Sequence, residues 1–291
     1  MQGGIIIGFG SLDLPSSVAY AIDPQTGAVN AIGPGSGIAL STGPAAGSIL
    51  YSTGVNIYEL HVDTGERKLY ACLSGFCNVG DLAYDRGADI VYALGLLYPL
   101  GAGYPDPVPA LFRLADSGIA YPGFPDSTEV SYSPVGPLGV AGINTIEYVP
   151  GTGIVGTDGY AMYQINASTG QASLLTTLAI VLPPPGPQGI TAINGLAYDP
   201  ETGRLIGSAP SGLGIGGYGS ARLYDIHIDQ TQPLFGLAVY LNADAPSLTG
   251  IADVTPTPEP SPIALLAASL VVLAARRKLT TDRIKLPTGG R

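Results

Sequence analysis

A repeated strand–turn–strand pattern is the feature that most limits what this chain can fold into. Its clearest copy is INGLAYDPETGRLIGSA, Ile193 to Ala209, in which two apolar stretches flank an Asp-Pro-x-Thr-Gly turn. After a Gly-rich interval, ARLYDIHIDQTQPLFGLAV, Ala221 to Val239, adds a second pair of strands joined by a turn. Two hairpins of this kind form a unit of roughly 45 to 50 residues, which is the size of a four-stranded propeller blade.

Degenerate copies of the unit occur along the rest of the first 254 residues. They are Ser17–Gly33, Gly47–Leu73, Val79–Gly95 with Ala110–Gly123, and Ile143–Gly159 with Tyr160–Leu178. In the first unit, Ile5 to Gly8 is expected to form a strand that pairs with Ser17 to Ile22. This unit lacks its own inner strand, and LTGIADV, Leu248 to Val254, has the character of one.

Together the copies predict an all-β fold, a β-propeller of about five four-stranded blades, with four or six blades left open. The C-terminal strand should pair into the N-terminal blade and close the ring, because closure removes exposed sheet edges. The composition agrees, since 42 Gly and 26 Pro among 291 residues favour many short strands and tight turns. The glycines have no three-residue period, which excludes collagen.

Four longer excursions interrupt the repeat, and long loops on a rigid β scaffold often carry binding residues. They are Leu96–Pro109, Tyr121–Pro137, Leu182–Gly189 and Ser211–Ser220. Their candidate contact residues are Tyr98, Tyr104, Tyr121, Tyr132, Tyr218, Asp106, Asp126 and Glu129. Tyrosines with acidic groups can stack on sugars and hydrogen-bond to them. The chain has no tryptophan, however, and Pro-rich loops also serve as inert covers.

Asp or Asn precedes Thr-Gly at the same place in several turns. The residues are Asp23, Asp63, Asn166 and Asp199. Such side chains bond the backbone N–H groups that follow them, and the Gly then takes the left-handed conformation that closes a hairpin. A calcium loop would gather several oxygen ligands within a dozen residues, which none of these turns does. We therefore interpret them as turn residues, and we expect no metal site.

The charge of the chain is unevenly distributed. Residues 1–254 carry 6 Lys/Arg and 20 Asp/Glu, a net charge of −14, whereas residues 255–291 carry 6 and 2, a net charge of +4. An acidic body of this kind is repelled by phosphates, which excludes nucleic acid as a partner.

Two cysteines, Cys72 and Cys77, stand five positions apart in CLSGFC. In an exported protein this spacing suits a local disulfide, with Gly75 letting the chain turn; two buried thiols are the alternative. A metal site would need at least two more ligands, and the two histidines, His61 and His227, lie far apart in the sequence.

Signatures of catalysis are sparse. His61 and His227 stand in the alternating strand sequences YELHVD and YDIHID, so they are expected to be ordinary strand residues. The glycines of Gly212–Gly219 lack the strand, helix and acid of a nucleotide site. The enzyme that fits best is a glycoside hydrolase with carboxylates on inner strands, and Asp81, Glu147 and Asp253 are the candidates. Inner-strand acids can equally well hydrate a channel, so we predict no enzyme and no cofactor.

The last tenth of the chain has a different character. In TPTPEPSPIALLAASLVVLAARRK, Thr255 to Lys278, a Pro-rich segment precedes the apolar run Pro262–Ala275, and a basic cluster follows it. Prolines keep the first part extended, the apolar run favours lipid, and the basic residues hold its end in the cytoplasm. The run rises only about 21 Å, short of a roughly 30 Å hydrocarbon core, so an ordinary anchor or a soluble helix are the alternatives.

This segment resembles a PEP-CTERM sorting signal, the C-terminal tag of exported proteins that an exosortase processes at the membrane. The resemblance covers residues 255–278 and implies a recognition motif at Pro258, Glu259 and Pro260, and a membrane stop at Arg276, Arg277 and Lys278. The polar tail 279–291 departs from the family, in which the basic cluster usually ends the chain. The family also begins with a signal peptide, which Met1–Leu14 does not resemble, so we expect the authentic start to be missing.

These patterns predict three parts: a propeller at 1–254, the sorting signal with its transmembrane helix at 255–278, and the polar tail at 279–291. The expected protein is exported, held transiently in the inner membrane, and then delivered to the cell surface or the extracellular matrix. Its expected role is structural, adhesive or polysaccharide-binding, with exosortase and exopolysaccharide as partners. A secreted carbohydrate-active enzyme and a surface filament or sheath subunit are the alternatives.

Overall fold

The structure, a computed structural model, describes the residues that form the strands and most of their turns. These are residues 5–10, 18–23, 28–34, 40–54, 56–73, 79–97, 107–121, 124–181, 192–210, 220–228, 236–246 and 248–254. Within them the chain forms twenty β-strands and no helix, so the fold is all-β as predicted.

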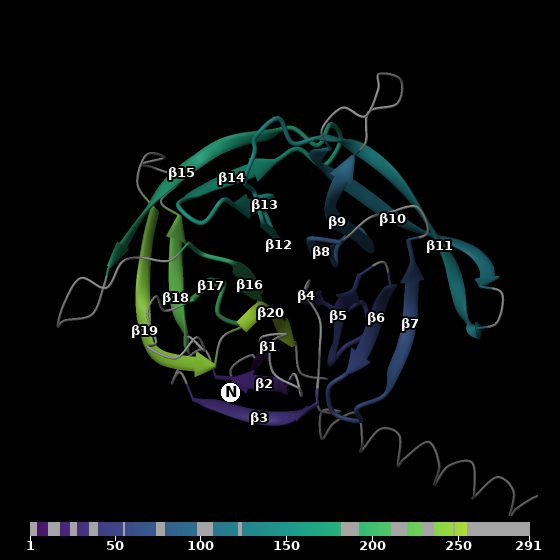
Figure 1. The fold of residues 1–291 in the computed structure, drawn as a ribbon, viewed down its shortest axis with the longest axis horizontal. Coiled ribbons are helices and arrows are strands. Elements are labelled where there is room, and N and C mark those ends of the chain that lie inside the picture. Colours follow the sequence, from purple (N-terminus) through teal and green to yellow (C-terminus); the bar gives the residue numbers. More distant parts are fainter. Residues whose placement is uncertain are drawn as a thin grey trace, which may run out of the picture. The chain divides into compact units, whose positions relative to one another are not determined.

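The strands form five antiparallel groups of four, arranged as a five-bladed β-propeller (Figure 1). Blade 1 contains β20 (Leu248–Val254), β1 (Ile5–Gly10), β2 (Val18–Ile22) and β3 (Val29–Pro34). Blade 2 contains β4 (Leu40–Thr42), β5 (Ser48–Thr53), β6 (Asn56–His61) and β7 (Arg67–Cys72). Blade 3 contains β8 (Asp81–Asp85), β9 (Ile90–Leu97), β10 (Val108–Tyr121) and β11 (Phe124–Pro137).

The last two blades follow the same order from the inner to the outer strand. Blade 4 contains β12 (Thr145–Val149), β13 (Gly153–Thr157), β14 (Ala161–Ile165) and β15 (Ala172–Val181). Blade 5 contains β16 (Gly195–Asp199), β17 (Arg204–Pro210), β18 (Ser220–Ile228) and β19 (Gly236–Pro246). The strands β4, β8, β12, β16 and β20 lie innermost (Figure 1).

The C-terminal strand closes the ring, as the sequence predicts. β20 pairs antiparallel with β1, so that Asp253 lies opposite Ile6 and Ile251 opposite Gly8. β1 pairs on its other edge with β2, which confirms the predicted N-terminal hairpin. Blade 1 therefore joins the two ends of the propeller domain, and the count of five blades is confirmed.

One prediction about the excursions is wrong. The segment Tyr121–Pro137 is not a loop, because β10 runs to Tyr121 and β11 occupies Phe124–Pro137. These 14-residue strands pair along most of their length, with three irregularities in the register that let a long, Pro-containing ribbon keep its pairing. Strands also reach into both ends of the excursion Leu96–Pro109.

Blades 4 and 5 are joined at their outer edge, which the repeat did not predict. Leu178–Val181 of β15 pairs in parallel with Gly236–Val239 of β19, so the two blades form one eight-stranded sheet. This pairing satisfies backbone groups of two edge strands that would otherwise be exposed.

The hydrophobic core is divided into layers between neighbouring blades. One layer joins blades 2 and 3 through residues such as Leu50, Leu82 and Phe112, and another joins blades 4 and 5 through Val155 and Leu196. Equivalent layers lie between blades 3 and 4 and between blades 1 and 2. Each inner strand is therefore buried on both faces, which explains why apolar residues run continuously through GLAYD-type sequences.

The chain divides into two units, Met1–Pro256 and Thr257–Arg291, and all described residues belong to the first. The predicted sorting motif at Pro258–Pro260, the apolar run and the basic cluster lie outside the described residues. The described strands and turns contain no helix with the length and hydropathy needed to cross a membrane. Cys72 ends β7 and is half-buried, whereas Cys77 lies outside the described residues, so the disulfide stays a prediction.

Candidate functional site

The inner strands of the five blades place equivalent residues at the same height along the propeller axis. Equivalence follows from the register of the two innermost strands of each blade, counted from their last backbone pair, which is Asp85 with Ile90 in blade 3 and Gly43 with Ser48 in blade 2. One position before this last pair stand the residues of what we term the tyrosine tier: Thr42, Tyr84, Tyr148, Tyr198 and Asp253.

Two further tiers follow along the same strands. The small-residue tier comprises Ser41, Ala83, Glu147, Ala197 and Ala252. The aliphatic tier comprises Leu40, Leu82, Ile146, Leu196 and Ile251. Every side chain of the aliphatic tier is at most 1% exposed, and Leu40, Leu82, Ile146 and Leu196 belong to the hydrophobic layers between neighbouring blades.

Glu147 is the exception in the small-residue tier. Its four counterparts are Ala or Ser and are fully buried, and Glu147 itself is 3% exposed. Because its neighbours in the tier are small, a long carboxylate can be accommodated at this height. Its Oε1 accepts a hydrogen bond of 2.8 Å from the Tyr148 N–H, while Oε2 is buried and has no hydrogen-bond partner of good geometry among the described residues.

Burial raises the pKa of Glu147 well above its usual range. The backbone N–H groups of Tyr148 and Tyr198 lower this pKa, and the nearby charges of Asp81 and Asp253 raise it further. Removal from water is the largest cause, because a carboxylate without solvent strongly prefers its neutral form. The surroundings of Glu147 thus favour its protonated form.

Asp81 is equally buried but fully bonded. Its Oδ2 accepts a short hydrogen bond from the Thr145 hydroxyl and a 2.8 Å bond from the Ile146 N–H, both on β12. The backbone N–H groups of Leu82 and Leu40 also bond its carboxyl group. Burial nevertheless raises the pKa of Asp81 from 3.8 to about 7, because desolvation raises this pKa by more than the four hydrogen-bond donors lower it. Asp81 therefore ties together blades 2, 3 and 4.

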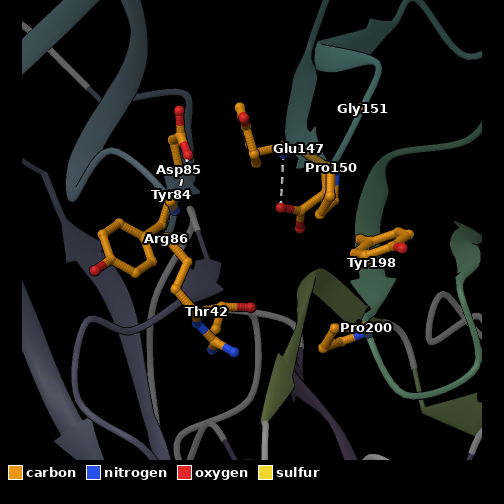
Figure 2. Close-up of a pocket in the computed structure, with 11 residues that line it drawn as sticks. Thr42, Tyr84, Asp85, Arg86, Glu147, Pro150, Gly151, Tyr198 and Pro200 are labelled. Atoms are coloured by element: carbon orange, nitrogen blue, oxygen red, sulfur yellow. Dashed lines mark hydrogen bonds between the residues drawn. The ribbon is translucent and has the colours of Figure 1, made fainter.

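A pocket of about 400 Å³ lies where the inner strands end. The tyrosine tier supplies Thr42, Tyr84, Tyr148 and Tyr198, and the small-residue tier supplies Glu147. The remaining lining residues come from the turns that follow β8, β12 and β16, and they are Asp85, Arg86, Gly87, Pro150, Gly151 and Pro200. Figure 2 shows the Glu147 carboxyl group pointing into this space, between Arg86 on one side and Tyr198 on the other.

A second pocket of about 440 Å³ adjoins the first, because Asp85 and Tyr148 line both. It continues over blade 4, where Gln164, Asn166 and Ser173 are among its lining residues. Tyr148 forms a side-chain hydrogen bond with Asp85, and burial and this carboxylate raise the pKa of the Tyr148 phenol. The two pockets are thus neighbours separated by the Tyr148–Asp85 pair, and we refer to them together as the recess.

The three acids named from the sequence lie as follows. Asp81, Glu147 and Asp253 all stand on inner strands, as predicted, and the pKa of Glu147 responds to the charges of the other two. Of the three, Glu147 lines the first of the two described pockets, and Asp81 and Asp253 line neither. Because Asp81 and Asp253 line neither described pocket, the three acids do not form a pair of carboxylates in an open pocket.

Other sequence-predicted residues lie outside this recess. His61 ends β6 and His227 lies in β18, so both are strand residues of outer hairpins, as predicted. Of the excursion residues, Tyr132 lies in β11, where its ring meets Phe112 edge to face. Tyr121, Asp126 and Glu129 also fall in β10 or β11, and Tyr98, Tyr104, Asp106 and Tyr218 lie outside the described residues.

The turn interpretation is confirmed for Asp199 and Asn166. Oδ1 of Asp199 accepts hydrogen bonds from two following turn amides, and Asn166 Oδ1 does the same. Gly203 and Gly170 then take positive φ values of 71° and 76°. In the part of the chain that the structure describes, no three His, Cys, Asp or Glu residues are grouped so as to hold a metal ion.

The sequence did not point to the tyrosines of the pocket, because long loops are the usual place for binding residues. Tyr84, Tyr148 and Tyr198 occupy the same place in DLAYD, TIEYV and GLAYD, and that repetition is visible in the sequence. The repetition indicates a shared site only once these three strands are known to be innermost and in register, and the sequence of one strand does not reveal that.

No family model matches the chain, and no curated protein matches it. Among solved structures, a chain of a nidogen/laminin complex is 10% identical with a TM-score of 0.47, over 87% of this chain and 98% of that one. An auxiliary nutrient binding protein from Bacteroides thetaiotaomicron is 10% identical with a TM-score of 0.39, over 70% and 42%. A PQQ-bound aldose sugar dehydrogenase from Streptomyces coelicolor is 13% identical with a TM-score of 0.35, over 70% and 83%.

Proposed function

We propose that this protein is an exported, cell-surface or matrix β-propeller that binds polysaccharide in the recess at the end of its inner strands. The observation that carries the proposal is the pair of adjoining pockets of about 400 and 440 Å³, lined by repeated tyrosines and by polar side chains. Each volume lies in the range of ordinary ligand sites.

The chemistry of the lining suits sugar. Tyrosine offers an apolar face for the C–H surface of a sugar ring and a hydroxyl for hydrogen bonding. Gln164 and Ser173 add amide and hydroxyl groups in the second pocket. Because Asp85 and Tyr148 are shared, one chain of linked units can occupy both pockets, which favours a polymer over a single small molecule.

The cellular side of the proposal is supported by the C-terminal sequence. Its Pro-Glu-Pro motif, apolar run and basic cluster would bring the propeller to the inner membrane and to an exosortase, and then to the surface. The acidic body would remain soluble there and accessible to matrix polymers.

The test is a glycan array probed with the full-length chain in mild detergent, with dissociation constants then measured for the ligands found. Tyr198→Ala should weaken binding about tenfold, the equivalent of about 1.4 kcal/mol. Tyr160→Ala is the matched control, because Tyr160 is 55% exposed and lies outside both pockets. Loss of affinity in both variants or in neither would show that the recess is not the binding site.

A second function, glycoside hydrolysis, is favoured by one observation: a desolvated glutamate with a raised pKa lines the pocket, as a general acid would. The second carboxylate of the first pocket, Asp85, accepts hydrogen bonds from the turn amides of Gly87 and Ala88. The same array should therefore be followed for release of reducing ends. Turnover that Glu147→Gln abolishes would replace the binding proposal with the enzyme.

A further inference from the structure

We propose that Glu147 makes this recess selective for polysaccharides whose sugar units carry a primary ammonium group, and that binding of the ammonium group releases a proton from the protein. The inference rests on the proposed function and names the chemistry of its ligand.

The first argument is the unused oxygen of Glu147. The side chain is 3% exposed, it points into the pocket, and its Oε2 has no hydrogen-bond partner of good geometry among the described residues. A buried polar atom left unpaired costs roughly 1–3 kcal/mol, and more when it is charged. A ligand that donates a hydrogen bond to Oε2 regains that free energy, and a charged donor regains the most.

The second argument is the aromatic lining. Tyr84, Tyr148 and Tyr198 come from three successive inner strands, and all line the pocket that holds the glutamate. Tyrosine rings attract a cation over their faces, and the attraction grows when water is excluded. A neutral hydroxyl would satisfy Oε2 as well, but it would gain nothing from the rings or from the carboxylate charge.

The third argument is the surrounding charge. Asp81 and Asp253 lie close enough to oppose the ionisation of Glu147, so a positive ligand charge would offset the repulsion that arises when Glu147 ionises. Arg86 is the cationic side chain among the residues that line the pocket, and it is engaged in an interaction of its own. Residues 1–254 carry a net charge of −14, which attracts a polycation from a distance.

The proton linkage follows from these contacts. The groups that face Glu147 are the carboxyls of Asp81 and Asp253, the backbone amides of Tyr148 and Tyr198, and the side chains of Asp85 and Arg86 across the pocket. Before a ligand binds, burial and the two carboxyls favour the protonated acid. An ammonium group reverses that preference, so a proton leaves when the ligand binds, and the affinity rises with pH while the ligand amine stays charged.

The experiment compares two tetrasaccharides of the same backbone, the tetramer of glucosamine and the tetramer of N-acetylglucosamine, on the full-length chain. The free amine should bind at least about tenfold more tightly, and Glu147→Gln should abolish the difference while keeping the weaker binding of the acetylated form. Glu201→Gln, on an exposed turn, removes a carboxylate without touching the pocket and should behave as the wild type.

Calorimetry in two buffers with different ionisation enthalpies measures the proton directly. The wild type should release protons when the glucosamine tetramer binds, and the Glu147→Gln variant should release none. Equal affinity for the two tetramers, a preference that survives in Glu147→Gln, or no proton release would overturn the inference and leave the proposed function standing. Failure to bind either tetramer or any glycan of the array would overturn both.

Discussion

Replacing Asp81 by Asn should remove a defined part of the pH dependence of stability that the wild-type propeller carries between pH 5 and pH 8. Burial raises the pKa of Asp81 from 3.8 to about 7, so the folded protein holds a proton that the unfolded chain releases. The stabilisation by this residue is therefore complete below about pH 3.8. It is lost progressively as the pH rises, and above about pH 7 it changes no further.

The size of the effect follows from the two pKa values. Each unit of difference is about 1.4 kcal/mol, so the whole interval from 3.8 to about 7 corresponds to about 4 kcal/mol. Between pH 5 and pH 8 the free energy of unfolding of the wild type should fall by about 2 to 3 kcal/mol because of this residue. Glu147 should further lower the free energy of unfolding as the pH rises, because burial raises its pKa as well.

The Asp81→Asn variant would keep an uncharged, similarly shaped side chain, whose amide oxygen in the place of Oδ2 can accept from both the Ile146 N–H and the Thr145 hydroxyl. It should therefore resemble the wild type near pH 5 and lose less stability near pH 8. Urea unfolding followed by tyrosine fluorescence across this range measures both slopes, with Glu201→Gln as the control for loss of an exposed carboxylate. An unchanged slope in Asp81→Asn, or a wild type that grows more stable from pH 5 to pH 8, would refute the reasoning.

Three further changes test the fold. Deletion of Leu248–Val254 removes the inner strand of blade 1 and should abolish the cooperative unfolding transition, seen by circular dichroism as a shallow melt in place of a sharp one. Gly207→Ala should destabilise the propeller by about 1–3 kcal/mol, because the new Cβ would lie 2.7 Å from Ile226 Cδ1; an unchanged urea midpoint would contradict the packing. Asp199→Ala should cost about 1–2 kcal/mol through the loss of three turn hydrogen bonds, whereas Asp199→Asn should retain most of the stability, and equal losses in the two variants would argue against the turn role.

The sequence predicted the blades well where the strand pattern and the turn residues indicate the same hairpin. Hairpins such as Ile193–Ala209 have apolar strands on both sides of a turn with its own side-chain acceptor, so their boundaries can be read directly. The three-residue strand β4 was not recognised, because LST offers no period and its blade begins after residues without strand character. The ribbon of β10 and β11 was mistaken for a loop because prolines and glycines interrupt it.

The candidate site was predicted only in part, for a different reason. Glu147 was named from its place on an inner strand, and the structure shows that it lines a pocket. Glu147 is unusual because the four equivalent positions of the other blades hold Ala or Ser. That comparison needs the strand register, which depends on pairings between segments as distant as Ile6 and Asp253.

Asp81 and Glu147 together indicate how a binding acid can be distinguished from a structural one in such a propeller. Both are desolvated, and both have raised pKa values, so neither burial nor pKa separates them. Asp81 receives four donors from three blades and has no further acceptor to offer, so its ionisation can only change the stability of the ring. Glu147 keeps a buried oxygen without a partner of good geometry among the described residues, at the wall of a pocket, so in our proposal a ligand supplies the donor that completes its bonding. At Asp81, the exclusion of water lowers the stability of the fold when the carboxyl group ionises. At Glu147, the same exclusion of water would strengthen the attraction between the carboxylate and a positively charged ligand.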